Sequence, residues 1–309
     1  MKDEASVQSG LDRHNRIKPL TNILFNLVFI ILGIIAVFPV LFVVMISLTA
    51  ESSIQEHGYQ IIPAAFSLDG YRFLYQQSDM ILRALGVSLF VTGVGTVLGV
   101  MLTTSMGYVM SRPQFRLKKF VTWLVFIPMI FNGGLVSSYY VTANLLHLKD
   151  SIWALILPLA VSSFNVIICK TFFRSTIPDA LVESAKIDGA SQLRIFLRIV
   201  LPISLPVLAT IGLFLSFSYW NDWFQSMLYI DNQNMYSLQA LLSKIMGQAD
   251  YLAKNASSLG VSIAEAASKM PKESARMAIT VLIVLPIACA YPFFQKYYTS
   301  GLTIGAVKE

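Results

Sequence analysis

The sequence predicts an all-α integral membrane protein with six transmembrane helices, and three observations support this prediction. Of the 309 residues, 55% are hydrophobic and only 13% are charged, with a mean hydropathy of +0.64. Soluble domains usually carry about 25% charged residues, so this chain needs lipid as its solvent. The other two observations are a series of uncharged apolar stretches and the distribution of Lys and Arg between them.

The apolar stretches are long enough to cross a bilayer. A helix needs about 20 residues to span the ~30 Å hydrocarbon core, and none of the stretches contains Asp, Glu, Lys or Arg. One such charge at mid-helix would cost about 2.5–3.5 kcal/mol on insertion. We therefore predict a single transmembrane domain over residues 1–309, with spans at about 24–48, 84–110, 120–144, 151–169, 199–220 and 278–294.

The first stretch is predicted to be a retained helix. Basic residues precede it, as they precede a signal peptide, but the apolar run is much longer than the roughly 7–15 residues of a signal sequence. No small-residue cleavage site ends the run.

Lys and Arg predict the orientation. With the N-terminus in the cytoplasm, the inner segments hold 15 of these residues and the longer outer segments hold 8. The positive-inside rule then places both termini in the cytoplasm. The outer loops are 49–83 and 221–276, and the long inner segment is 170–198, which contains most of a loop at 175–202. Within the second outer loop, Leu238, Leu241, Leu242 and Ile245 recur at helical spacing.

The long inner segment predicts two short helices joined by a turn. Pro178 suits a first helical position, and Asp179 and Glu183 complement the dipole of the first helix. Gly189 is the natural left-handed residue to end that helix, and Ser191 can cap the second one. In the second helix, one face is predicted to be apolar and the opposite face basic. The apolar face comprises Leu193, Phe196, Leu197 and Val200, and the basic face comprises Arg194 and Arg198.

This segment resembles the EAA loop of binding-protein-dependent ABC importers. That loop reads E-A-A, three residues, G, nine residues, then I-x-L-P. The chain has Glu183-Ser184-Ala185, Gly189 and Ile199-Val200-Leu201-Pro202 at these spacings, and Ser184 is the one departure. The resemblance implies that contacts with a partner ATPase are made by Glu183, Ser184, Ala185, Asp188, Gly189, Ile199, Leu201 and Pro202.

The resemblance covers nearly the whole chain and extends to the carbohydrate-uptake branch of these importers. It implies a type I ABC importer permease fold with a cytoplasmic coupling helix, closest to permeases for oligosaccharides or complex glycans. The tail is similar to the C-terminus of the second maltose-type permease. The stretches concerned are 132–135, 153–158, 219–223, 291–293 and 301–308.

The resemblance also implies a location and a set of partners. The chain would lie in the bacterial cytoplasmic (inner) membrane with a homologous second permease, two ABC ATPase subunits, an extracytoplasmic solute-binding protein and a sugar substrate. No G-x-x-x-x-G-K-[ST] phosphate loop occurs in the sequence. ATP and Mg²⁺ are therefore expected on the partner ATPases, and this chain is expected to be no enzyme and to bind no cofactor, metal or nucleic acid.

Two other classes of protein were weighed. An ion-coupled secondary sugar transporter usually has ionisable residues within its spans, and the predicted spans contain none. An intramembrane enzyme would need a catalytic motif such as H-E-x-x-H or G-x-S-x-G, and the sequence contains neither.

Aromatic and amide side chains near the span ends are candidates for a sugar pathway. The bland alternative is that these aromatics form an interfacial belt or pack between helices. Elsewhere, Gly95 and Gly99 form a G-x-x-x-G pattern that permits close helix crossing, and Gly133-Gly134 is predicted to break the third span. The candidates for the pathway are Phe131, Asn132, Tyr139, Tyr140, Tyr219, Trp220, Asn221 and Trp223.

Overall fold

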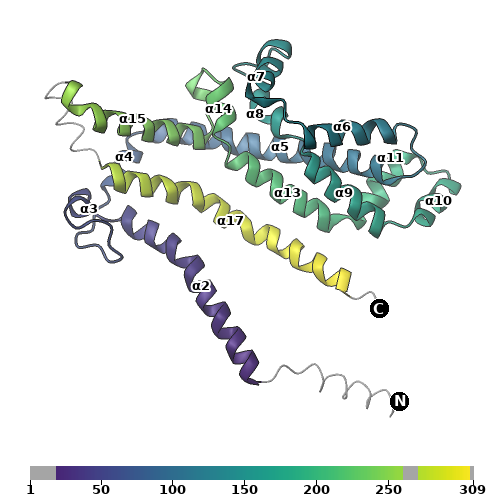
Figure 1. Cartoon of the computed structure of the whole chain (residues 1–309), viewed down its shortest axis with the longest axis horizontal. Coiled ribbons are helices and arrows are strands. Elements are labelled where there is room, and N and C mark those ends of the chain that lie inside the picture. Colours follow the sequence, from purple (N-terminus) through teal and green to yellow (C-terminus); the bar gives the residue numbers. More distant parts are fainter. Residues whose placement is uncertain (1–18, 260–270, 307–309) are drawn as a thin grey trace. The chain divides into compact units, whose positions relative to one another are not determined.

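The computed structural model describes residues 19–259 and 271–306, which are mainly helical (Figure 1). Their one β feature is an isolated bridge between Thr49 and Phe66, so the predicted all-α class is confirmed. Residues 260–270 of the second outer loop and residues 307–308 of the tail lie outside the described residues. Contacts divide the described chain into two units, 19–71 with 273–281 and 72–272 with 282–306.

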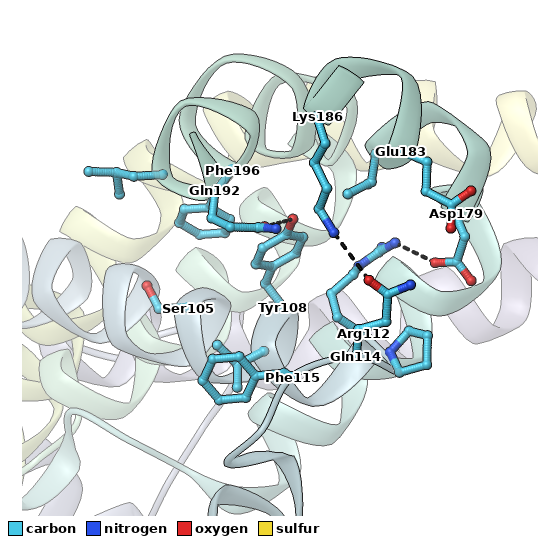
Figure 2. A pocket seen from close by; sticks show the side chains of 14 residues that line it. Ser105, Tyr108, Arg112, Gln114, Phe115, Asp179, Glu183, Lys186, Gln192 and Phe196 are labelled. Carbon is cyan, nitrogen blue, oxygen red and sulfur yellow. Dashed lines mark hydrogen bonds and ion pairs between the residues drawn. The ribbon is translucent and has the colours of Figure 1, made fainter. Parts of the chain in front are cut away.

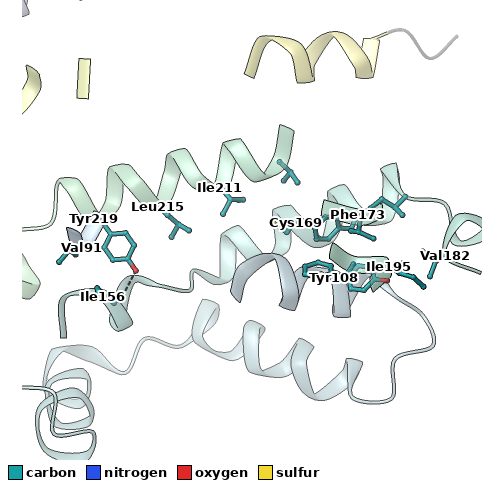
Figure 3. Packing of buried hydrophobic residues seen from close by; sticks show 14 of the residues in the cluster. Val91, Tyr108, Ile156, Cys169, Phe173, Val182, Ile195, Ile211, Leu215 and Tyr219 are labelled. Atoms are coloured by element: carbon teal, nitrogen blue, oxygen red, sulfur yellow. Dashed lines mark hydrogen bonds between the residues drawn. The ribbon is translucent and has the colours of Figure 1, made fainter. Parts of the chain in front are cut away.

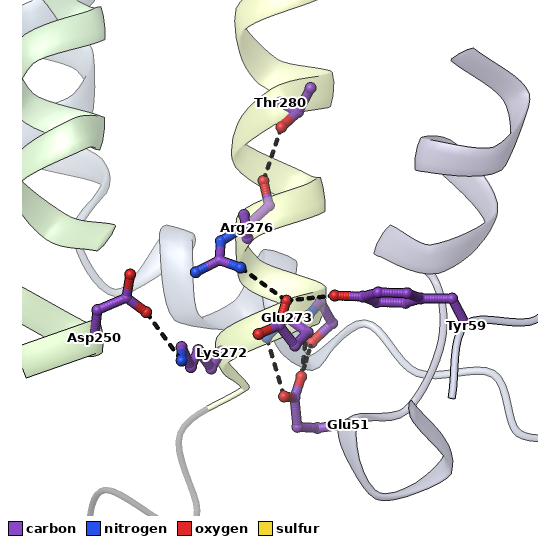
Figure 4. A network of polar contacts seen from close by, with 8 residues as sticks. Glu51, Tyr59, Asp250, Lys272, Glu273, Arg276 and Thr280 are labelled. Atoms are coloured by element: carbon purple, nitrogen blue, oxygen red, sulfur yellow. Dashed lines mark hydrogen bonds and ion pairs between the residues drawn. The ribbon is translucent and has the colours of Figure 1, made fainter. Parts of the chain in front are cut away.

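The first unit contains α2 (Pro19–Ser47), α3 (Glu51–His57) and the first turns of α17 (Lys272–Ala306). The Glu51 carboxylate accepts hydrogen bonds from the backbone N–H groups of Glu273 and Ser274, each at 3.0 Å (Figure 4). An acceptor at this position satisfies helix N–H groups that have no partner within the helix. Glu51 therefore caps the start of α17 from a distant part of the sequence.

Tyr59 extends this polar network. Its hydroxyl donates to Glu273 Oε2 at 2.7 Å, and Arg276 Nη1 donates to the same oxygen at 3.0 Å (Figure 4). The hydrogen bond to the carboxylate raises the pKa of Tyr59, because it favours the protonated phenol. The first predicted outer loop is thus folded onto the start of the last helix.

The second unit is organised around α5 (Ser78–Ser111), which packs against α9 (Ser163–Thr176) and α13 (Leu205–Trp220). The short α4 (Asp69–Tyr75) leads into α5. Figure 3 shows buried apolar side chains between these helices. The core includes Val91, Tyr108, Ile156, Cys169, Phe173, Ile211 and Leu215.

Glycines on α5 allow the close crossing that their spacing predicted. A Cβ added at Gly99 would lie 2.7 Å from the carbonyl oxygen of Ala160 and 2.8 Å from Leu215 Cδ1. A Cβ added at Gly95 would meet the ring of Tyr219. Any larger residue at these two positions would push α5 away from its neighbours.

Fewer helices than six satisfy the requirements for crossing a membrane unaided. Three described helices are long and apolar enough, at 19–47, 78–111 and 272–290, and up to five are if each of two bent helix pairs crosses as one span. The predicted third span, 120–144, is not among them. Its helix α6 (Lys118–Ile130) has 13 residues, which rise only about 20 Å. The six-span count is therefore not reproduced by helix length alone.

The third span is interrupted where the glycine pair predicted a break. Residues 131–133 are not helical, and Gly134 has a φ of +80°, a conformation that favours glycine. The chain then continues as α7 (Gly134–Tyr139) and a π-helix, η1 (Tyr140–Leu145).

The fourth and fifth predicted spans are bent. In the fourth, α8 (Trp153–Ile156) and η2 (Leu157–Leu159) meet α9 at 50°. In the fifth, residues 192–203 meet α13 at 84°. The bend falls at Ser204, between Pro202 and Pro206, and proline cannot donate the N–H that a continuous helix needs. Residues 199–204, predicted to begin the fifth span, instead belong to the preceding segment.

The remaining helices follow α13. They are α14 (Phe224–Tyr229), η4 (Gln233–Met235) and α15 (Leu238–Leu259). The four apolar residues predicted to share a face of α15, from Leu238 to Ile245, are all buried. The backbone N–H of Leu238 donates to Ser88 Oγ on α5 at 2.8 Å, which fixes the start of α15.

Candidate functional site

The predicted helix pair exists, as α10 (Asp179–Ile187) and α11 (Gln192–Ile195). Gly189 lies at the turn between them with a φ of +78°, and its N–H donates to the Lys186 carbonyl at 3.0 Å. Ser191 Oγ accepts from the Arg194 N–H at 3.3 Å, so it caps the second helix as expected. Pro178 precedes the first helix by one residue and occupies its N-cap position.

The α10 helix buries one side and exposes the other. Val182 and Ala185 are buried, whereas Ile187 is 87% exposed. Of the eight coupling residues, Ala185 is buried and Ile199 and Leu201 are half-buried. The other five, Glu183, Ser184, Asp188, Gly189 and Pro202, are exposed.

The prediction of which residues form the buried apolar face of the second helix is wrong in part. Phe196 and Val200 are buried as expected, but Leu193 is 67% exposed and Leu197 is 49% exposed. Ile195, which the prediction left out, is fully buried. The reason is that residues 196–200 form a π-helix, η3 (Phe196–Val200). A π-helix brings residues five apart onto one face, so Ile195 and Val200 point inward together.

A pocket of about 400 Å³ lies between this helix pair and the C-terminal end of α5 (Figure 2). Its walls are mainly apolar, but charged and amide side chains reach into it from both sides. From the end of α5 and the following loop come Tyr108, Arg112, Gln114 and Phe115, and from the helix pair come Asp179, Glu183, Lys186, Gln192 and Phe196.

Arg112 holds the most contacts at this pocket. Its Nη1 donates to Asp179 Oδ1 at 2.9 Å. Its Nη2 donates to the carbonyl oxygens of Phe173, at 3.3 Å, and Ile177, at 3.5 Å. The guanidinium also lies over the Tyr108 ring, 5.2 Å from the ring centre. A cation suits this place because the last carbonyls of α9 carry partial negative charge.

Two further hydrogen bonds join the helix pair to α5 and to the loop that follows it. The Tyr108 hydroxyl donates to Gln192 Oε1 at 3.4 Å, and Lys186 Nζ donates to Gln114 Oε1 at 3.4 Å (Figure 2). The Tyr108 ring also packs on Phe196, with 5.1 Å between ring centres. The sequence pattern identifies Arg112 only as one of the basic residues of an inner segment, and Tyr108 and Gln192 belong to no motif. An Arg-Pro pair directly after an uncharged run was the available clue.

Two of the sugar-pathway candidates are buried between helices. The Tyr219 hydroxyl donates to the Ile156 carbonyl at 2.7 Å. Trp220 Nε1 donates to the Ile283 carbonyl at 3.2 Å. Both side chains are under 10% exposed, which agrees with the packing alternative for these aromatics.

The other six candidates lie nearer the surface but do not form one cluster of contacts. Tyr139 stacks on Tyr229 with 5.8 Å between ring centres. Trp223 makes an edge contact with Phe224, and Asn132 Oδ1 accepts from the Gly134 N–H at 2.9 Å. Phe131, Tyr140 and Asn221 are exposed. Among residues 19–259 and 271–306, no group of three or more His, Cys, Asp or Glu side chains could hold a metal.

The fold and the site together define the class of protein. Apolar helices long enough to cross a membrane carry a short helix pair that is bonded to their ends, and this arrangement suits a membrane permease subunit. The chain belongs to the family described as binding-protein-dependent transport system inner membrane components, whose model matches residues 95–304.

Individual relatives agree with this membership. Protein LplC of Bacillus subtilis is 37% identical over 276 residues, covering 89% of this chain and 90% of its own. The polygalacturonan/rhamnogalacturonan transport system permease protein YtcP of the same organism is 38% identical, with coverages of 89% and 94%. A bacterial ABC transporter involved in import of the acidic polysaccharide alginate contains a chain of the same fold, with a TM-score of 0.73, 24% identity and coverages of 90% and 96%.

Proposed function

We propose that this chain is the transmembrane subunit of an ATP-driven importer that moves oligosaccharides or glycan fragments into the bacterial cytoplasm. The observation that supports this most is the helix pair α10–α11, which is bonded to α5 and α9 and exposes Glu183 and Ile187. The names of relatives such as YtcP support a sugar substrate. The family also favours ATP-driven transport over the ion-coupled alternative.

The importer would contain several other subunits. A homologous second permease would complete the pathway, and two ATPase subunits would bind beneath the permease pair, one of them at the exposed side of α10. ATP and Mg²⁺ would bind there, because this chain has no phosphate loop of its own. An extracytoplasmic solute-binding protein would deliver the sugar to the opposite side of the membrane. The Lys and Arg distribution supports an orientation with both termini and the helix pair in the cytoplasm.

The sugar would pass the exposed candidates rather than the buried ones. Phe131, Asn132 and Tyr140 lie at or just after the break in the third span, and aromatic faces and amides are the groups that hold sugars. Tyr219 and Trp220 would act indirectly, by fixing the packing of α13.

Uptake by cells that lack this chain tests the proposal. The deletion strain is complemented with the wild-type chain or with Glu183→Lys, and both are offered labelled oligogalacturonides, alginate oligomers and arabino-oligosaccharides. We expect the wild type to restore uptake of at least one probe and Glu183→Lys to restore little, at equal amounts of chain in the membrane.

A second arm separates ATP-driven from ion-coupled transport. Vesicles that contain the whole complex are supplied with ATP and a protonophore. Uptake that continues with the protonophore and stops without ATP supports the proposal. Uptake that follows the ion gradient and ignores ATP would favour the alternative.

A further inference from the structure

We infer that Arg112 is the positioning residue that fixes the coupling loop, residues 175–202, to the membrane-spanning helices, so that α10 moves as one body with the ends of α5 and α9. The inference rests on the proposed function, since it concerns how the loop of that function acts. It assigns a role to a residue outside the EAA-like motif.

One guanidinium joins three elements. Arg112 lies directly after α5, bonds Asp179 in the first turn of α10 and bonds two carbonyls at the end of α9. These contacts link residues 61 to 67 positions apart in the sequence. The side chain is 11% exposed, so water cannot easily replace the bonds if one partner is removed.

The geometry needs arginine rather than any cation. A guanidinium is planar and presents five N–H donors in a fixed fork, whereas an ammonium is a point charge on a flexible stem. Here Nη1 serves the carboxylate while Nη2 serves the carbonyls, and the flat face lies over Tyr108. Lysine has three donors but neither the fixed fork that reaches the carboxylate and the carbonyls on two sides nor a flat face for the Tyr108 ring.

The contacts that hold the loop differ from the surface proposed to bind the ATPase. Tyr108–Gln192 and Lys186–Gln114 add bonds on the same side of the loop as Arg112. None of these bonds uses Glu183 or Ile187. Loss of Arg112 should therefore leave ATPase binding in place while the loop no longer transmits its movement to the spans.

The first test compares point variants in the whole complex, purified through a tag on this chain and placed in vesicles. Arg112→Met is compared with Arg116→Met, which removes the same charge from an exposed position in the same loop. We expect Arg112→Met to retain the ATPase but to lower sugar transported per ATP hydrolysed by about tenfold, the size of effect that loss of a charged hydrogen bond produces. Arg112→Lys should fall between, and Arg116→Met should match the wild type.

A variant of the partner tests whether the bond to Asp179 matters. Asp179→Asn weakens one of the three bonds and leaves the two carbonyl bonds in place, so it should lower transport per ATP less than Arg112→Met does. Equal coupling in Arg112→Met and the wild type would overturn the inference.

A cross-link provides a test that does not depend on the stability of an Arg112 variant. With Cys169 and Cys289 replaced by Ala, Gln114→Cys and Lys186→Cys are joined by a short thiol-reactive linker. We expect transport to continue, because the two segments move together. Loss of transport on linking, with full transport before it, would show that α10 moves relative to α5 and would refute the inference.

Different results would contradict the proposed function and the role of Arg112. If the wild-type complex neither binds an ATPase nor transports with ATP, the proposed function fails. If the wild type does both and the Arg112 variants are coupled as well as it is, only the inference fails.

Discussion

Gly189 is the position in the coupling loop where the backbone conformation most strongly restricts the residue type. Its φ of +78° lies in the left-handed region, and no atom lies within 4 Å of an added Cβ. The cost of a side chain there is therefore backbone strain, roughly 1–2 kcal/mol, and not a steric clash. We expect Gly189→Val to misdirect the helix pair and to reduce co-purification of the ATPase severalfold, and Gly189→Asn to be milder because Asn tolerates this conformation.

Gly58 is a matched control for Gly189. It has a φ of +72° and is equally uncrowded, but it ends α3 in the first unit. Gly58→Val should carry similar strain and leave ATPase co-purification unchanged. If both variants lost the ATPase equally, general instability and not the turn at Gly189 would be the cause.

Asp222, which follows α13, makes the stability of the folded chain depend on pH. Burial raises its pKa to about 6, although the backbone N–H groups of Phe224 and Gln225 act against this. The unfolded value is about 3.9, so the folded state holds the proton more tightly. The stability that this group contributes is complete below pH ~4 and is lost as the pH rises to ~6.

Thermal melting of the purified complex between pH 4 and 7 measures this dependence. Asp222→Asn should remove the fall in melting temperature that the wild type shows over this range. Asp231→Asn alters an exposed carboxylate that pairs with Lys149 and should leave the fall in place. Identical profiles for the wild type and Asp222→Asn would contradict the assignment.

At the scale of elements, α15 has one buried side and one exposed side. Leu242 is buried in the packing of the second unit, whereas Tyr251 and Lys254 are exposed. We expect the exposed side to touch the solute-binding protein, because the helix lies in the segment 221–276, which the Lys and Arg distribution predicts to be outside. Tyr251→Ala with Lys254→Glu should weaken binding-protein docking about tenfold or more at unchanged thermal stability.

A buried variant of the same helix provides the comparison. Leu242→Ala should destabilise the unit by about 2–5 kcal/mol, as large-to-small changes in a core do. Docking measured by binding of labelled solute-binding protein to vesicles, together with melting of the complex, separates the two effects. Wild-type docking by the Tyr251 and Lys254 variant would refute contact through this face.

The sequence predicted those elements whose conformation is determined by residues close together in the chain. The turn at Gly189, the cap at Ser191 and the helix from Leu238 follow from residue types a few positions apart. The bond from Arg112 to Asp179 joins residues 67 positions apart, and hydropathy carries no information on such a pair. The bend at Ser204 was missed because the flanking residues are apolar and continue the run, although two prolines flank the position.

At the scale of the whole molecule, the break in the third predicted span decides how many times the chain crosses the membrane. A topology with six crossings places 15 of the Lys and Arg residues inside and 8 outside. The described helices give three clear spans, or five with the bent pairs. The difference lies in 118–145, where α6 is too short to cross alone but α6, α7 and η1 together have 25 helical residues. If this segment crosses as a broken helix, the count is six.

Cysteine accessibility decides between the two counts. In a chain with Cys169 and Cys289 replaced by Ala, single cysteines are placed at Arg116 and Lys149, which flank the broken segment, and at Lys254 and Lys308. An impermeant thiol reagent added to intact cells should label the cysteines at 149 and 254, and it should reach those at 116 and 308 only after the membrane is opened.

The expected labelling follows because the alternative, in which the broken segment does not cross, would place basic residues outside. If the broken segment turned back without crossing, positions 116 and 149 would face the same side. The topology of every later segment would then be inverted relative to the N-terminus, and the basic segment 175–202 would lie outside, against the positive-inside rule. Labelling of 116 and 149 from the same side would therefore refute the six-span topology. Labelling of 254 and 308 from the same side would show that α17 does not cross.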